Sequence, residues 1–172
     1  HDSSDFGVLN TPETIPYILK TLKDFSKSTD VHIGPISIGM HFNPYGESLV
    51  SNKKKIRLEM ADSDPRHDQL FSLTWTLAIF IQSINKESKF FTFNSIYGNH
   101  GILNKDNTKR PLYHLNNFLI SLSNSEIFKF NPVNEVYGLK IVLNDKNYYL
   151  FVNSSKQKKE INIPELDFSH QY

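Results

Sequence analysis

The sequence predicts an α/β chain in which helices alternate with buried strands, followed by a part built from strands alone. Apolar residues recur at helical spacing in three segments, at 12–27, 64–84 and 111–121. Two short apolar runs, 31–38 and 90–93, lie between these helices. From Ile127 onwards the pattern changes to that of short strands. Alternating units followed by strands alone indicate two architectural parts.

The start of each helix carries a recognisable signal. Residues 1–10 are polar and predict a loop, after which Thr11 is a suitable N-cap and Pro12 suits the first helical position. Asp64 and Pro65 repeat this arrangement before the second helix. The third helix is expected to begin at Pro111.

The second helix is apolar over more than one face. Its main stripe is widened by Trp75, Ile79 and Phe80, so we expect both sides of this helix to be covered. Trp75 lies in the middle of the helix, which favours a place in the core over an exposed position that could stack on a sugar.

The strand at 31–38 is apolar on both faces, as in a parallel sheet covered by helices. Two parallel strands do not form a stable sheet alone. We therefore expect further strands from an N-terminal part of the same polypeptide. The chain begins without Met, which indicates a processed or cut start, and the sequence assigns no compartment.

The second part is expected to form an antiparallel accessory segment. Its strands are predicted at 127–130, 136–143, 148–152 and 160–163. Residues 144–147 read Asn-Asp-Lys-Asn and predict a hairpin turn.

Composition excludes several classes of function. The net charge of +1 gives no reason to expect nucleic acid or an anionic membrane as a partner, and no apolar run approaches a membrane span. The absence of cysteine excludes disulfides. The seven histidines are scattered without metal-ligand spacing, and no phosphate-binding glycine loop occurs, so we expect neither a metal nor a cofactor.

Candidate site residues follow from the position of parallel strands, because ligand sites form at their carboxyl ends. His1, Asp2 and Asp5 would lie at such an end if a strand precedes them, and the two carboxylates could act as acid and base. The alternative is a solvated turn. His41 and Asn43 follow the strand at 31–38 and could transfer a proton and bind a hydroxyl, although Asn-Pro also forms simple turns.

A third set of polar residues follows the strand at 90–93. Asn94 and Tyr97 are types that hydrogen-bond and stack on sugars, and the alternative is a glycine-containing turn. Asp64 and Arg66 favour a structural interpretation, in which Asp64 caps the helix and Arg66 pairs with a nearby carboxylate.

The order of these motifs resembles the C-terminal portion of the D-apionate lactonase family. The matching stretches are HDSSDFGVLNTPETI, HIGPISIGMHFNP, DPRHDQLFSLTWTLAIF, FFTFNSIYGNHGI and PLYHLNNFL. The resemblance implies that residues 1–124 are the last units of a (β/α)8 TIM barrel. It also implies that residues 125–172 belong to a β-sandwich-type accessory domain. The strands at 31–38 and 90–93 would then be the seventh and eighth.

Two positions depart from the family's pattern. His41 stands where the family has Arg before Phe-Asn-Pro, and Asn94 stands where the family has Glu at the end of the eighth strand. An amide cannot act as a carboxylate base or nucleophile. Asp2 and Asp5 are retained, and they become the candidate catalytic residues.

Two functions remain open, beside the interpretation that the chain is an independent small α+β domain of unknown role. The first is a carbohydrate-active hydrolase, of a sugar lactone or a glycoside, whose activity we expect from a complete barrel and not from this chain alone. The site would use Asp2 and Asp5 for proton transfer, and His1, His41, Asn43, Asn94 and Tyr97 to bind the substrate. The alternative is a catalytically impaired carbohydrate-binding or scaffold protein. Both take a small carbohydrate or sugar acid as ligand.

Overall fold

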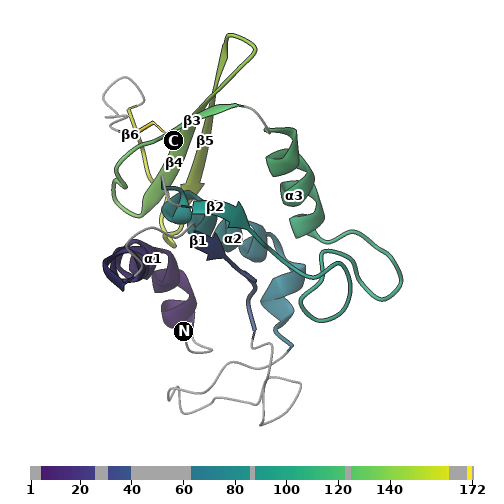
Figure 1. Ribbon diagram of the computed structural model, residues 1–172. Helices are drawn as coiled ribbons and strands as arrows, with labels where there is room; N and C mark the ends of the chain where they lie inside the picture. Colours follow the sequence, from purple (N-terminus) through teal and green to yellow (C-terminus); the bar gives the residue numbers. More distant parts are fainter. Residues whose placement is uncertain are drawn as a thin grey trace.

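A computed structural model describes residues 5–25, 31–39, 63–85, 88–122, 125–162 and 170–171. Helices and strands alternate first, in the order α1 (Asp5–Phe25), β1 (Val31–Ile33), η1 (Pro65–Asp68), α2 (Leu70–Ser83), β2 (Ser88–Phe91) and α3 (Pro111–Ser121). Strands alone follow, in the order β3 (Glu126–Lys129), β4 (Val136–Leu143), β5 (Lys146–Asn153) and β6 (His170–Gln171). Figure 1 shows the antiparallel sheet above the α/β part. The predicted order of elements is confirmed.

The two strands of the α/β part pair in parallel, β1 beside β2. Their hydrogen bonding continues beyond the strands, since Ile36 N donates to Thr92 O at 3.1 Å. β1 is shorter than the predicted strand 31–38 because Gly34 has a φ of +145° and Pro35 has no N–H to donate. A Cβ on Gly34 would lie 2.3 Å from Thr92 O, so this close approach of the two chains requires glycine.

Helix α1 corrects one sequence prediction. Residues 5–10 were expected in a loop, but the helix begins at Asp5, and Pro12 lies inside it. A proline within a helix leaves the carbonyl four residues earlier without its usual donor. That carbonyl belongs to Val8, and the indole Nε1–H of Trp75 donates to it at 2.8 Å. The bond to α2 therefore compensates for Pro12, which is a tertiary effect that local sequence signals do not reveal.

Helix α2 is buried on two sides, as its sequence predicts. On one side Trp75 and Ile79 pack with Val8 of α1 and with Ile36 and Ile38, which follow β1. Trp75 is 4% exposed, so the predicted core position is confirmed.

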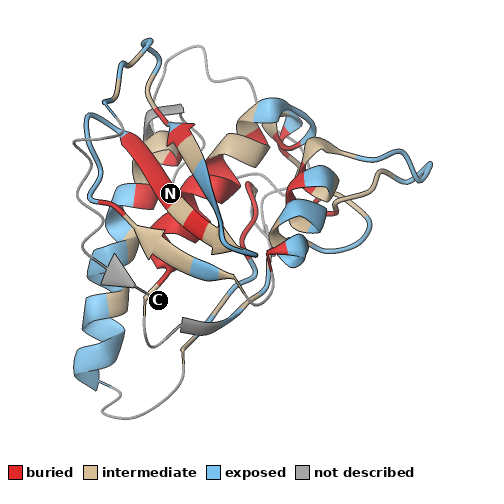
Figure 2. Cartoon of the chain, turned by 90° about the horizontal axis from the view of Figure 1, so that it is seen from above, coloured by how far each residue is buried: buried red, intermediate tan, exposed pale blue. Residues whose placement is uncertain are grey.

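The other side of α2 meets α3 and the antiparallel sheet in a second hydrophobic cluster. The buried members of this cluster are Leu77, Ala78, Phe80, Ile81, Ile84, Leu112, Leu115, Leu122, Tyr137, Leu139, Ile141 and Val152. Figure 2 shows the buried residues concentrated along α2 and β4. One apolar core thus continues across residue 124, and the division into parts 1–124 and 125–172 stays a prediction.

The antiparallel sheet has the strand order β5-β4-β3-β6. Asn144 and Asp145 form the β4–β5 turn with positive φ values of 50° and 61°, as expected for a two-residue hairpin. Lys129 of β3 donates from Nζ to Gln82 O at 3.3 Å, near the end of α2, and burial lowers the pKa of Lys129 to about 8.

The last predicted strand is not formed where it was expected. Residues 160–162 have no strand structure, and residue 163 lies outside the described residues. The chain after β5 turns instead, because Asn153 Oδ1 accepts from Ser155 N at 2.9 Å and Asn153 Nδ2 donates to Gln157 O at 2.8 Å. The edge of β3 that faces away from β4 pairs with β6. The described residues form one antiparallel layer, and a second layer stays a prediction.

The substitution Trp75→Phe tests the link between α1 and α2. It removes the side-chain donor that reaches Val8 O and, among the described residues, leaves that carbonyl without this bond. We expect the free energy of unfolding to fall by about 2–4 kcal/mol, from the lost hydrogen bond and the smaller ring. Chemical denaturation followed by circular dichroism measures this loss.

Phe80→Leu, a change of similar size on the other side of α2, controls for packing alone. A Trp75→Phe variant as stable as the native chain would contradict this role.

Candidate functional site at the strand ends

The carboxyl ends of β1 and β2 lie side by side because the two strands are parallel neighbours. The segment after β1 leads to η1 and α2, and the segment after β2 leads to α3. This edge is therefore where a parallel α/β unit places its ligand site. Of the predicted site residues, Asn94 and Tyr97 follow β2 at this edge, and Asp5 is the first residue of α1. His1, Asp2, His41 and Asn43 lie outside the described residues.

Asn94 joins the two strand ends. Its Nδ2 donates to Ile36 O at 3.0 Å, which ties the residue after β2 to the chain that follows β1. Its Oδ1 is buried and has no hydrogen-bond partner among the residues that the structure describes. The contact at Ile36 O requires a donor, and an ionised carboxylate has none. The local geometry therefore suits the amide that stands where the resemblance predicts Glu.

Tyr97 lies on the long segment between β2 and α3, and its side chain is 56% exposed. The segment folds back on itself, since Ile102 N donates to Ser95 O and Leu103 N to Ile96 O, both at 2.9 Å. A Cβ on Gly101 would lie 2.5 Å from the carbonyl carbon of Tyr97, so the close approach of the chain to itself at this point also requires glycine. The side-chain hydrogen bond of Asn94 goes to Ile36 O and not to Tyr97.

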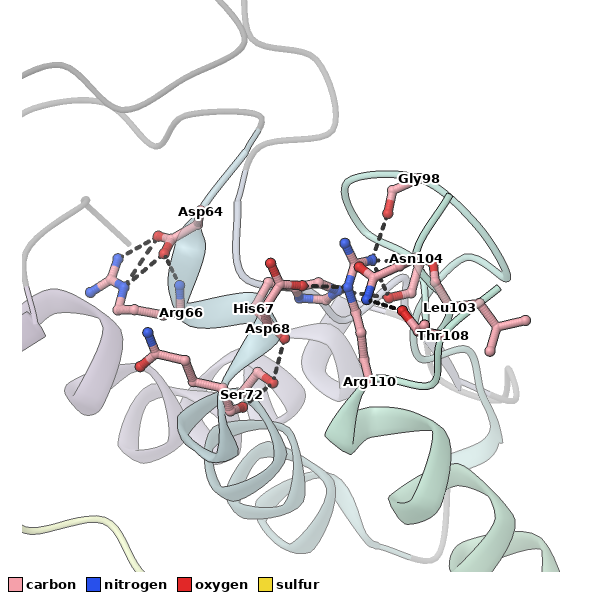
Figure 3. A network of polar contacts seen from close by, with 12 residues as sticks. Asp64, Arg66, His67, Asp68, Ser72, Gly98, Leu103, Asn104, Thr108 and Arg110 are labelled. Carbon is pink, nitrogen blue, oxygen red and sulfur yellow. Dashed lines mark hydrogen bonds and ion pairs between the residues drawn. The ribbon is translucent and has the colours of Figure 1, made fainter. Parts of the chain in front are cut away.

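Arg110 holds the same segment from its far end. Its Nη1 donates to the carbonyls of Gly98 at 2.6 Å and Gly101 at 2.8 Å, and its Nε pairs with the Asp68 carboxylate of η1. Figure 3 shows the guanidinium between η1 and the turn at Gly98. The single planar guanidinium of Arg110 thus attaches the β2–α3 segment to η1.

His67 provides a second attachment. The ring is 1% exposed, and Nε2 lies 3.0 Å from Gly101 O. Because a carbonyl only accepts, Nε2 carries the proton and Nδ1 is left as an acceptor. Burial lowers the pKa of His67, Arg110 lowers it further, and the bond to Gly101 opposes them. His67 is therefore neutral at pH 7 and serves as a fixed donor to the segment.

Asp64 and Arg66 form an ion pair at the start of η1. Asp64 is 4% exposed, its Oδ1 accepts from Arg66 N at 2.9 Å, and its Oδ2 lies 2.6 Å from Arg66 Nη2. Both oxygens also accept from Arg66 Nε, which makes the pair bidentate. The predicted helix cap and ion pair are confirmed.

Sequence reasoning missed His67, Asp68 and Arg110. The signal for Arg110 was its place directly before Pro111, the same arrangement as Asp64 before Pro65. His67 and Asp68 carried no local signal, because their partners are distant in sequence.

Comparison with known proteins identifies the family. Residues 1–124 match the family model described as "D-apionate lactonase, TIM barrel domain". This chain belongs to the D-apionate lactonase family. A curated relative, the D-apionate lactonase of Brucella anthropi, is 30% identical over 119 residues, which cover 66% of this chain and 20% of the relative. The chain thus spans about a fifth of that relative's length. No solved structure matches the chain.

Two further findings concern only the described part of the chain. No three metal-binding side chains among His, Cys, Asp and Glu come together there. No helix in these ranges combines the length and the apolar character that a membrane crossing requires.

The substitution Asn94→Asp tests the hydrogen bond at the strand ends. It places a carboxylate against Ile36 O, and we expect a loss of about 1–3 kcal/mol at pH 8. Protonation restores a donor, so the pKa of the introduced carboxyl should rise above the usual value of about 3.9. A raised pKa means that the loss is smallest at low pH and grows as the pH rises.

Denaturation of this variant at pH 5 and pH 8 measures the difference. Asn147→Asp, at an exposed position on β5, is the matched control and should change stability little at either pH. Equal losses in the two variants would show that Asn94 makes no special contact.

Proposed function

We propose that this chain supplies the closing units of a (β/α)8 barrel, with β1 and β2 as the seventh and eighth strands. The complete protein would hydrolyse the lactone of a sugar acid. The observation that carries the proposal is the match of residues 1–124 to the lactonase barrel family, combined with a parallel strand pair that ends at a polar edge. Residues 125–172 would form the accessory segment that covers α2.

Hydrolysis of a lactone adds water to the ring carbonyl and breaks the bond between that carbon and the ring oxygen. The products are a carboxylate and a hydroxyl on one open chain. The reaction needs a base that accepts a proton from water and an acid that returns one to the leaving oxygen. Asp2 and Asp5 are the candidates for these roles.

The neutral substrate would be held by hydrogen-bonding and stacking groups at the same edge. The candidates are His1, His41, Asn43, Asn94 and Tyr97. Asn94 would act mainly by fixing the two strand ends, because its Nδ2 is engaged by Ile36 O. Tyr97 would bind the substrate through its exposed ring. An N-terminal part of the same polypeptide would complete the barrel around them.

A second candidate function is carbohydrate binding without turnover. The observation in its favour is Asn94, an amide at the position where the family resemblance predicts Glu. If that carboxylate is essential for the reaction, the site would still bind sugar acids and lactones but would not open them.

The two functions are separated by assaying the complete polypeptide on aldonolactones, D-apionolactone among them, and on aryl glycosides. Lactone opening releases one proton per turnover, which a pH-stat measures directly. We expect turnover of a lactone and none of the glycosides. Binding of a lactone without proton release would support the second function.

Two matched variants test the proposed base. Asp5→Asn should lower kcat by about 100-fold or more, as expected for loss of general acid–base catalysis. Asp24→Asn removes the same charge from an exposed position near the other end of α1 and should leave kcat unchanged. Equal turnover by the two variants would exclude Asp5 from the reaction.

A further inference from the structure

The chain between β2 and α3 contains a loop whose two arms are joined and whose outer part is apolar. We call residues 95–103 the rim loop, because they follow the carboxyl end of β2. Ile102 N and Leu103 N of the returning arm donate to carbonyls of the outgoing arm. Near the tip, Ile96 and Tyr97 are 62% and 56% exposed. Two adjacent large side chains offer an apolar contact surface at the edge where a parallel α/β unit places its ligand site.

Arg110 closes this loop at its base. Its Nη1 donates to Gly98 O at 2.6 Å and to Gly101 O at 2.8 Å, and Leu103 O lies 3.4 Å away. Three carbonyls of the rim loop thus converge on one guanidinium nitrogen, and only 10% of the Arg110 side chain is exposed. Because arginine is not deprotonated in proteins, this attachment does not depend on the protonation of Arg110.

The guanidinium and the rim loop are both attached to η1. Arg110 Nε pairs with the Asp68 carboxylate, and His67 Nε2 donates to Gly101 O at 3.0 Å. Ser72 Oγ of α2 donates to His67 O at 2.8 Å, which joins η1 to the buried helix. Figure 3 shows these contacts around Arg110. The rim loop is therefore attached to η1, and through η1 to α2, at two points.

We propose that Arg110 is a positioning residue of the lactone site, which acts by holding Ile96 and Tyr97 against the carbon face of the bound ring. The identity of the ligand rests on the proposed function, which supplies a sugar lactone. Such a ring exposes C–H groups, and apolar side chains cover them without hydrogen bonds. A surface that is already fixed loses less conformational entropy on binding than a loop that has to be ordered. Arg110 contacts the loop and not the lactone.

Steady-state kinetics of the complete polypeptide on D-apionolactone tests this role. Arg110→Gln should raise KM about tenfold and leave kcat within about twofold, because the loop contributes to binding and not to proton transfer. Lys109→Gln removes a neighbouring charge from an exposed side chain that lies over the Tyr113 ring, and it should leave KM unchanged. A native KM for Arg110→Gln, or equal effects of the two variants, would overturn the proposal.

A double-mutant cycle shows whether Arg110 acts through the rim loop. Ile96→Ala and Tyr97→Ala together remove the apolar surface and should raise KM by themselves. Adding Arg110→Gln to that variant should then raise KM no further, because the loop has no contact surface left to position. If the separate effects on KM multiply instead, Arg110 acts elsewhere in the structure and the proposal is wrong.

Amide hydrogen exchange of the complete polypeptide gives a readout that needs no turnover. The amides of Ile102 and Leu103 are bonded within the rim loop, and we expect Arg110→Gln to speed their exchange about tenfold or more. The amide of Leu139 in β4 should keep its native rate. Faster exchange in a protein that opens no lactone would remove the proposed function and leave the attachment of the loop by Arg110 in place. Lactone turnover with unchanged exchange and unchanged KM in Arg110→Gln would overturn the positioning role alone.

Discussion

The structure depends on the burial of helix α2 from two sides. A helix that ends a β/α unit normally covers a sheet with one face and meets water with the other. Here Trp75 and Ile79 pack toward α1 and the residues after β1, while Leu77 and Ile81 pack toward α3 and the antiparallel sheet. Because apolar area contributes roughly 25 cal/mol per Å², the second buried face stabilises the contact between the accessory sheet and the α/β part.

Polar contacts then determine how α2 is placed along its axis. Near the middle of α2 the Trp75 indole donates to the Val8 carbonyl that Pro12 leaves without a donor, and near the end of α2 Lys129 donates to Gln82 O. This placement in turn fixes η1, which Asp64 caps and in which His67 is buried. His67 of η1 donates to Gly101 O. Arg110 donates to the same carbonyl and pairs with Asp68 of η1, so the segment that carries Tyr97 is attached to η1.

The sequence predicted the features that depend on neighbours in the chain. The helix α3, the strand β4, the turn at Asn144 and the cap at Asp64 all follow from local patterns, and the structure confirms them. The family was recognised from the order of motifs, each of which is weak alone.

The features that sequence reasoning missed depend on distant partners. Pro12 falsely indicated a helix start, because only the folded structure brings Trp75 to the Val8 carbonyl. His67 bonds to Gly101 and Arg110 pairs with Asp68, each across more than thirty positions in the sequence, so no local spacing reveals these contacts. The strand expected from Glu160 is not formed over residues 160–162, whereas β6, which was not predicted, pairs with β3.

The central claim is that α2 joins both parts of the chain into one cooperative unit. The most direct measurement is equilibrium unfolding in urea, followed at the same time by Trp75 fluorescence and by NMR signals of the β4 amides. Trp75 reports on the α1 side of α2, and β4 reports on the opposite side. If α2 couples the two sides, both probes show one transition with the same midpoint. Two separate midpoints would contradict the account.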